Sequence, residues 1–236
     1  MRRQYVQVII EFPHSMWISK NTIRFSFKEE ISHPNFYAVQ AFNRFLKKQL
    51  RHHLVECVAS YHTVTAYVKQ RIDVDLLRRQ WLDSQASTAI DDRTNRLLKI
   101  PVCYDEEYAL DRRRVMDYTG LSFDDIKMIH LSKSYYVYLI GFLPGFPYLG
   151  ELDSKLFVPR LEKPRASVSA SSVGVGGGQT GIYPVDSPGG WNIIGKTPFE
   201  LFNINGKEPF LFELGDEVQF YEITKQQYWE MKSKGV

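Results

Sequence analysis

The sequence predicts a small α+β domain followed by a larger, mainly-β barrel domain. Up to about residue 85, strand-like alternation and amphipathic helical spacing follow one another along the chain. A polar segment, residues 84–96, then interrupts the apolar periodicity as a linker does. From residue 97 onward, short strand-like runs are separated by glycine and proline turns. We therefore expect an α+β sandwich over residues 1–90 and a β-barrel over residues 91–236.

Each predicted element of the first domain shows either the two-residue period of a half-buried strand or the three- and four-residue spacing of an amphipathic helix. Pro34 suits the first turn of a helix, and Asp73 suits a helix N-cap. The expected elements are strands over residues 4–12 and 21–27, a helix from Pro34 to Leu54, two strands within residues 55–68 that meet near Ser60, and a helix from Asp73 to Trp81.

The second domain is expected to close its sheet, because closure removes the exposed edges of many short strands. Asn205-Gly206 is a hairpin turn signal between two alternating runs near the end of the chain. The other expected elements are a strand from Leu97, two short helices over residues 111–121 and 122–131 that separate around Gly120, and a buried strand over residues 135–140.

Composition excludes several classes of function. The chain has 30 basic and 27 acidic residues, and its basic runs are spaced like solvated helix faces, so a nucleic-acid-binding face is not expected. No apolar run approaches the ~20 residues that span a bilayer. Two cysteines without a CxxC pair, and no signal-peptide pattern at the start, predict a reduced, cytoplasmic protein. No second His or Cys stands at ligand spacing, so no metal site is predicted.

The chain is organised around residues 141–197, which hold eleven of its fifteen glycines. Glycine permits tight turns and close backbone approach. The same stretch carries aromatic residues between the glycines, among them Phe142, Phe146, Tyr148, Tyr183 and Trp191. Their combination predicts tight turns that frame an aromatic surface.

Two phosphate-binding patterns occur in this stretch and both fail on context. Residues 190–197 match GxxxxGK[ST], but Pro198 and a strand-like run follow where a P-loop requires a helix. Residues 176–181 match GxGxxG, but Pro184 forbids the helix that a dinucleotide-binding turn needs. We therefore predict that neither segment cradles phosphates.

Three segments, GFLPGFPYLG, SVGVGGGQTGIYP and SPGGWNIIGKTP, resemble in order and spacing the signature of a bacterial family. Its members are the B-type subunit of 5-oxoprolinase, the smaller allophanate-hydrolase-like subunit (subunit 1) and a sporulation histidine-kinase inhibitor. The resemblance implies a cyclophilin-like barrel. The chain departs from the family's pattern at Ser169, Ser171, Gly177 and Lys196, which affects local turns and any bidentate anion contact at Lys196.

His130 is the only histidine of the second domain and, with the resemblance, is the predicted proton-transfer residue. Gln179 is predicted to act with it, on an exposed polar floor. The alternatives are a structural histidine at a helix end and glycines that only turn a barrel corner. The predicted substrate-binding residues are Thr180, Tyr183, Arg160, Arg165 and Lys196, of which the three cations are alternatively solvated rim residues.

The resemblance implies one subunit of an ATP-dependent 5-oxoprolinase, which opens 5-oxo-L-proline to L-glutamate and is inactive as this chain alone. ATP with Mg²⁺ is then used by the complex and is not tightly bound to this chain. The implied partners are a larger subunit-C-type (allophanate hydrolase subunit 2-like) protein and a subunit-A-type protein, with Phe142, Phe146, Tyr148 and Trp191 as the partner-binding surface. The alternatives are an inhibitor of a sensor histidine kinase and half of a urea/allophanate-type carboxyltransferase with a biotinylated partner.

Overall fold

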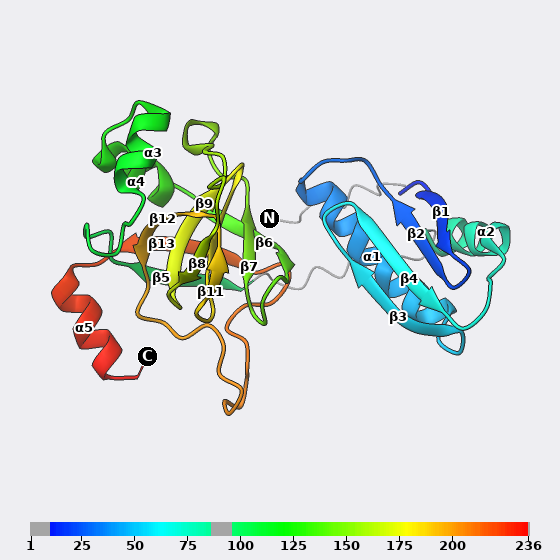
Figure 1. Ribbon diagram of the computed structural model, residues 1–236. Helices are drawn as coiled ribbons and strands as arrows, with labels where there is room; N and C mark the ends of the chain where they lie inside the picture. The colour runs from blue at the N-terminus through cyan, green and yellow to red at the C-terminus, as the bar shows by residue number, and fades with distance from the viewer. Residues whose placement is uncertain (1–9, 86–95, 236) are drawn as a thin grey trace, which may run out of the picture. The chain divides into compact units, whose positions relative to one another are not determined.

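The computed structural model describes residues 10–85 and 96–235 (Figure 1). The chain divides into two compact units, Met1–Arg93 and Thr94–Val236. Residues 4–9 of the first predicted strand, and residues 86–95 of the predicted linker, lie outside the described residues. No helix in the described ranges is long and apolar enough to cross a membrane.

The first unit is a four-stranded antiparallel sheet, in the order β1-β2-β4-β3, with two helices. Phe42 lies at the centre of its core, with its ring centroid 4.9 Å from that of Phe25 and 5.0 Å from that of Trp81. The elements are β1 (His14–Ser19), β2 (Thr22–Ser26), α1 (His33–Gln49), β3 (Leu54–Ala59), β4 (Thr63–Val68) and α2 (Val74–Gln85).

The first strand was predicted over residues 4–12, but β1 is His14–Ser19, so the predicted position is wrong. Residues 10–13, which include the described end of the first predicted strand, are irregular, and the strand begins only at His14. The reason lies in where its apolar residues point: Met16 and Ile18 are 51% and 46% exposed. Apolar residues on the outer face of a sheet give no inside-outside alternation from which a strand can be recognised.

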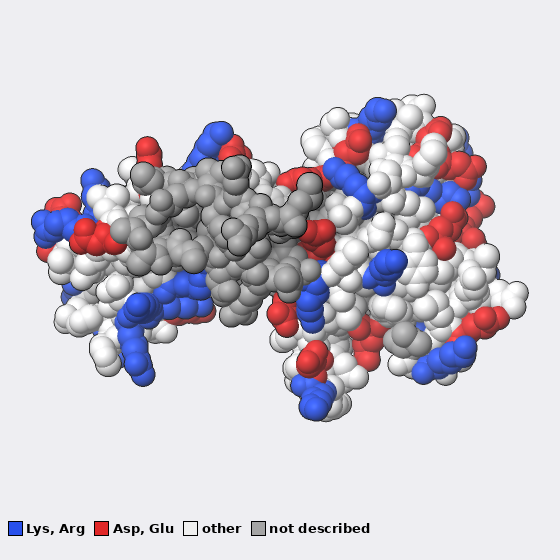
Figure 2. Space-filling view, turned by 180° about the vertical axis from the view of Figure 1, so that it is seen from behind, with Lys and Arg blue, Asp and Glu red and all other residues white. Residues whose placement is uncertain are grey.

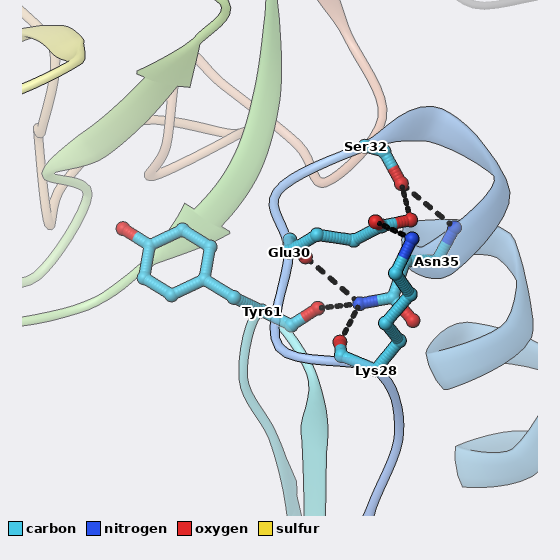
Figure 3. A network of polar contacts seen from close by, with 5 residues as sticks. All are labelled: Lys28, Glu30, Ser32, Asn35 and Tyr61. Atoms are coloured by element: carbon cyan, nitrogen blue, oxygen red, sulfur yellow. Dashed lines mark hydrogen bonds and ion pairs between the residues drawn. The ribbon is translucent and has the colours of Figure 1, made fainter.

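A polar network fixes the start of α1 (Figure 3). The hydroxyl of Ser32 accepts a hydrogen bond from the backbone N–H of Asn35, at 3.4 Å, and so caps the helix. The buried side-chain amide of Asn35 donates to the backbone carbonyls of Lys28, Glu30 and Tyr61, at 3.0, 2.9 and 3.3 Å. Through this one amide, the segment before α1 is tied to the turn between β3 and β4.

The second unit contains a seven-stranded sheet, in the order β12-β9-β10-β7-β6-β13-β5, and a separate pair formed by β8 and β11. Helices α3 and α4 lie together at one end of this unit (Figure 1). The elements are β5 (Leu97–Val102), α3 (Arg112–Thr119), α4 (Phe123–Leu131), β6 (Ser134–Ile140), β7 (Pro147–Gly150), a 3-10 turn (Ser154–Leu156), β8 (Arg165–Val168), β9 (Ser172–Gly176), β10 (Gln179–Ile182), β11 (Ser187–Gly189), β12 (Asn192–Lys196), β13 (Glu217–Glu222) and α5 (Lys225–Ser233).

The seven-stranded sheet curls until its two outer strands meet. Just beyond β5, Cys103 exchanges two backbone hydrogen bonds with Lys196 of β12, with N···O distances of 2.8 and 2.9 Å. Gly195 permits this approach: a Cβ built there would lie 2.8 Å from a Val102 methyl carbon and 2.9 Å from the Cys103 carbonyl oxygen. The curled sheet encloses an apolar core that includes Ile100, Val137, Val173 and Val218.

The C-terminal part differs from the prediction in two places. The hairpin expected around Asn205-Gly206 is reduced to one isolated bridge, Phe202 to Phe210, and the run that follows forms β13, which pairs with β5 and β6. Helix α5 was not predicted. Its signal is a capping box, in which Thr224 and Gln227 each bond the other's backbone N–H.

Candidate functional site

His130, at the end of α4, is fully buried in the core of the second unit. Its Nε2 lies 3.0 Å from the hydroxyl oxygen of Thr180, and its Nδ1 lies 2.8 Å from that of Tyr104. The Thr180 hydroxyl donates its only proton to the carbonyl of Gly174, at 3.0 Å. It must therefore accept from Nε2–H, so Nδ1 carries no proton and accepts from Tyr104.

The surroundings of His130 keep the ring neutral. Burial lowers its pKa from 6.5 to about 3. Both ring nitrogens have partners, and the ring stacks on Phe220 with centroids 4.6 Å apart. This geometry holds α4 against strands β9 and β10, and it gives no support to the predicted proton-transfer role.

Gln179 and Thr180, at the start of β10, lie inside the sheet. Thr180 is 0% exposed and Gln179 is 9% exposed, so the exposed polar floor expected from the sequence is not present. The residues pair with Val175 and Gly176 of β9 in the sheet register. Strand pairing in the middle of a curled sheet explains their burial, and the predicted catalytic role of Gln179 gains no support from it.

A pocket of about 320 Å³ opens elsewhere in the glycine-rich stretch, and five of the predicted site residues, Arg160 among them, line it. The lining residues come from both ends of the glycine-rich stretch and from residues 159–164, a segment that begins and ends with proline. Within that segment, the sequence predicted only Arg160 as a site residue. The lining residues are Phe142, Tyr148, Arg160, Leu161, Pro164, Tyr183, Pro188, Gly189, Gly190 and Trp191. We call this the Arg160 pocket.

Phe146 lies beneath the Arg160 pocket as the centre of an aromatic cluster. Its ring centroid is 5.8 Å from that of Phe142, 4.9 Å from Tyr148, 5.2 Å from Tyr183 and 5.5 Å from Trp191. Phe146 and Trp191 are buried, at 1% and 4% exposure, whereas Phe142 is 65% exposed. Within the predicted partner-binding set, Phe146 and Trp191 are therefore core residues, and Phe142 offers the largest exposed surface.

Gly189 leaves room for the Tyr183 side chain at the edge of the pocket. A Cβ built at Gly189 would lie 2.2 Å from the Tyr183 hydroxyl oxygen, which is closer than any real contact. Burial raises the pKa of Tyr183, opposed by a backbone hydrogen bond from Trp191, and burial likewise raises the pKa of Tyr148. Both phenols are therefore neutral at neutral pH and can donate or accept hydrogen bonds.

Arg160 alone is charged among the described residues that line the pocket. Its guanidinium lies over the Trp191 ring, 5.3 Å from the centroid. Within the described part of the chain, no carboxylate lies within ion-pair distance of it. The pocket therefore combines apolar walls with one cation, an arrangement that accepts a small anion with an apolar body.

Arg165 and Lys196, the other two predicted cations, do not line the pocket. Arg165 donates to Asp111 at 2.6 Å, and the second carboxylate oxygen of Asp111 accepts from the backbone N–H of Ile193 at 2.6 Å. Through Asp111, this part-buried pair holds β8 to β12. Lys196 stands where the sheet closes, and burial lowers its pKa. The sequence contained no signal for the role of Asp111.

Both phosphate-binding patterns are parts of strands. Residues 192–196 of the GxxxxGK[ST] match form β12, and the GxGxxG match is the turn between β9 and β10. Neither segment is followed directly by a helix, as the sequence context predicted, and the absence of phosphate binding stays a prediction. Among the described residues no group of three or more His, Cys, Asp or Glu could hold a metal ion. On the face shown in Figure 2, acidic and basic side chains are interspersed and do not gather into a basic patch.

Comparison with known proteins places the chain in a family. The model of the carboxyltransferase domain, subdomain C and D, matches residues 13–212. The 5-oxoprolinase B subunit of Bacillus subtilis (strain 168) is 34% identical over 220 residues, which cover 88% of this chain and 92% of that protein. The resemblance seen in the glycine-rich motifs is thereby confirmed.

Two solved structures share the fold. The protein TTHA0988 is 33% identical, with a TM-score of 0.70 over 86% of this chain and 40% of that one. Urea carboxylase of Kluyveromyces lactis is 18% identical, with a TM-score of 0.73 over 94% of this chain and 22% of that one. The chain belongs to the family of the carboxyltransferase domain, subdomain C and D.

Proposed function

We propose that the chain is the B-type subunit of a 5-oxoprolinase complex, which hydrolyses 5-oxo-L-proline to L-glutamate at the expense of ATP. The observation that carries this proposal is the match to the B subunit of 5-oxoprolinase over nearly the whole length of both proteins. The Arg160 pocket supports it, because its cation and aromatic walls suit a small cyclic acid.

The reaction needs an activated amide, since water attacks an unactivated lactam carbonyl slowly. Transfer of the γ-phosphoryl group of ATP to the lactam oxygen makes the ring carbon electrophilic. Water then attacks that carbon, the ring C–N bond breaks to leave γ-glutamyl phosphate, and the freed nitrogen takes a proton to become the amino group of glutamate. A second water hydrolyses the acyl phosphate, which releases inorganic phosphate and the γ-carboxylate. Stabilising the charge that develops in these steps is the largest task of such a site.

We assign the ATP chemistry to partner subunits. The GxxxxGK[ST] segment is strand β12, closed against Cys103, and offers no helix N-terminus for phosphates. The contribution of this chain is then one wall of a shared site, in which the Arg160 pocket holds the acid. A larger C-type subunit provides the rest of that site, and an A-type subunit is the third component of the complex. The longer chain of TTHA0988, of which this chain covers 40%, supports such partnership.

A second candidate function is half of a urea-type carboxyltransferase. The fold shared with urea carboxylase of Kluyveromyces lactis favours it. The two functions require different chemistry, since the carboxyltransferase needs a biotinylated partner and the lactam hydrolase does not. At 18% identity this likeness extends to the fold alone, so we place it second.

Reconstitution tests the proposal. The chain is purified alone and after co-expression with C-type and A-type proteins from the same organism, and glutamate release from 5-oxo-L-proline is followed with and without ATP. We expect ATP-dependent release from the complex and none from the chain alone. Release by the chain alone would contradict the shared site. A complex that is inactive on 5-oxo-L-proline but transfers carboxyl groups from biotin to urea would favour the second function.

A further inference from the structure

We propose that Arg160 binds the carboxylate of a small cyclic acid in the Arg160 pocket, and that the chain does this alone, before any partner joins it. The choice of 5-oxo-L-proline as that acid rests on the proposed function. The carboxylate recognition itself does not, because it is argued from the charge, shape and contacts of this pocket.

Arg160 carries a positive charge that no carboxylate in the described structure pairs with. Two arginines of the second unit differ in this respect: Arg96 forms two hydrogen bonds to Asp216, at 3.0 and 2.6 Å, and Arg165 bonds Asp111 at 2.6 Å. Arg160 instead faces an aromatic ring, within a pocket whose other lining residues are uncharged. Arg160 is itself exposed, so its guanidinium is accessible to an anionic ligand that enters the pocket.

Trp191 restrains the position of the Arg160 guanidinium. Arg160 lies over the Trp191 ring at 5.3 Å, and stacking on an aromatic face restrains a flexible side chain. Trp191 is itself held by the aromatic cluster, edge to face with Phe146 at 5.5 Å. A guanidinium in this position has N–H groups that can match the two oxygens of a carboxylate.

The Arg160 pocket is small and its walls are mostly apolar. The pocket volume of about 320 Å³ is near the lower end of the about 300–1,000 Å³ typical of ligand pockets, which suits a small ligand. Phe142, Tyr148 and Pro188 provide apolar surface for a ring, and the neutral hydroxyl of Tyr183 can donate to an amide carbonyl. A five-membered ring that bears a carboxylate has the required shape and charge.

The test uses the full chain without partners and three probes. 5-Oxo-L-proline carries both the lactam and the carboxylate, cyclopentanecarboxylate carries only the acid, and 2-pyrrolidinone carries only the lactam. Binding is measured by ligand-observed NMR and by quenching of tryptophan fluorescence. We expect the two acids to bind and 2-pyrrolidinone to bind at least about tenfold more weakly, because it lacks the charge-assisted hydrogen bonds to Arg160.

A pair of variants locates the site. Arg160→Gln removes the charge while keeping much of the stem, and we expect it to weaken binding of both acids by at least about tenfold. Arg113→Gln is the matched control: Arg113 lies on α3 with its side chain 95% exposed, outside the pocket, and this variant should bind as the original chain does. Thermal unfolding of both variants checks that they are folded.

Two outcomes would overturn the inference: equal binding of all three probes, or unchanged acid binding by folded Arg160→Gln. Failure of the proposed function gives a different result. If the chain binds both acids through Arg160 but its complex does not turn over 5-oxo-L-proline, the carboxylate site is supported and the proposed reaction is wrong. If the Arg160→Gln complex hydrolyses 5-oxo-L-proline with an unchanged KM, the proposed reaction is supported and the carboxylate site is wrong.

Discussion

Replacing His130 with glutamine should remove a pH dependence from the stability of the second unit. Burial lowers the pKa of His130 from 6.5 to about 3, so the folded ring stays neutral where the unfolded ring binds a proton. Above about pH 6.5 the neutral ring therefore does not lower the free energy of unfolding, and below it the free energy of unfolding falls progressively as the pH approaches 3. Glutamine does not titrate, so this part of the acid destabilisation should disappear in His130→Gln.

The magnitude follows from the shift. One pKa unit is worth about 1.36 kcal/mol, so at about pH 4.5, two units below the unfolded pKa, His130 should lower the free energy of unfolding by about 2–3 kcal/mol. At neutral pH, glutamine can still donate to Thr180, but Tyr104 loses the Nδ1 acceptor that lies 2.8 Å away. A buried hydroxyl without a partner costs about 1–3 kcal/mol. The variant should thus be less stable at neutral pH and less sensitive to acid.

The assay must report on the second unit alone, because unfolding of the first unit would add its own signal to a measurement on the whole chain. Urea unfolding is followed by hydrogen exchange and mass spectrometry of peptides that cover β9 and β10, at several pH values between about 7 and 4.5. His14→Gln, at an exposed histidine of β1, is the control and should keep the original pH dependence. If His130→Gln lost as much stability on acidification as the original chain, the assignment of this pH dependence to His130 would be refuted.

Turnover of the reconstituted complex separates packing from proton transfer. A general acid–base residue is typically worth about 10²- to 10⁴-fold in rate. Because His130 is sealed in the core, we expect the folded His130→Gln complex to keep a rate near that of the original. A hundredfold lower turnover rate in a His130→Gln complex of unchanged stability would show that His130 takes part in the reaction.

Further predictions concern the aromatic cluster and the glycine motifs. Phe142→Ser should change the free energy of unfolding by no more than about 0.5 kcal/mol yet weaken assembly in co-purification, whereas Phe146→Ala should cost about 3–5 kcal/mol in urea unfolding; the reverse pattern would contradict the division between surface and core. Gly189→Ala should displace the Tyr183 ring and weaken 5-oxo-L-proline binding in a folded chain, and unchanged binding would show that this contact is not needed. The isolated chain should bind no Mg-ATP that Lys196→Ala abolishes, as measured by calorimetry; such binding would restore the P-loop interpretation.

Local signals explain which elements could be predicted. Pro34 and the spacing of Phe42 with the leucines that follow identified α1, and Gly120 separated α3 from α4, where it takes the left-handed conformation. Strand β1 was missed because its outer residues are apolar and exposed. Helix α5 was missed because, among its described residues, Tyr228 alone is buried, which leaves little apolar period to detect. Its capping box was the remaining signal.

The site was harder to predict, because sequence cannot say which side of a curled sheet a residue faces. His130 and Arg160 were both reasonable polar candidates near the same motifs. The fold places His130 inside the sheet, between Tyr104 and Thr180, and Arg160 in an open pocket. Arg165 looked equivalent to Arg160, but its partner Asp111 lies 54 residues away in sequence and only the folded chain brings them together. Long-range pairing of this kind carries no local pattern.

Phe142 combines two unfavourable features that a bound partner would help to explain. Its backbone is left-handed, with φ of 69°, which a residue with a bulky side chain rarely adopts, and its ring is 65% exposed. The turn that holds it is closed by two hydrogen bonds, from Gly141 to the carbonyl of Phe146 and from Phe146 to the carbonyl of Leu143, at 3.2 and 3.1 Å. Strain of this kind costs about 1–3 kcal/mol and is found most often at functional sites. Burial of the exposed ring against a partner would offset part of that cost, and it would also cover one wall of the Arg160 pocket, so that assembly and acid binding would be coupled at this residue.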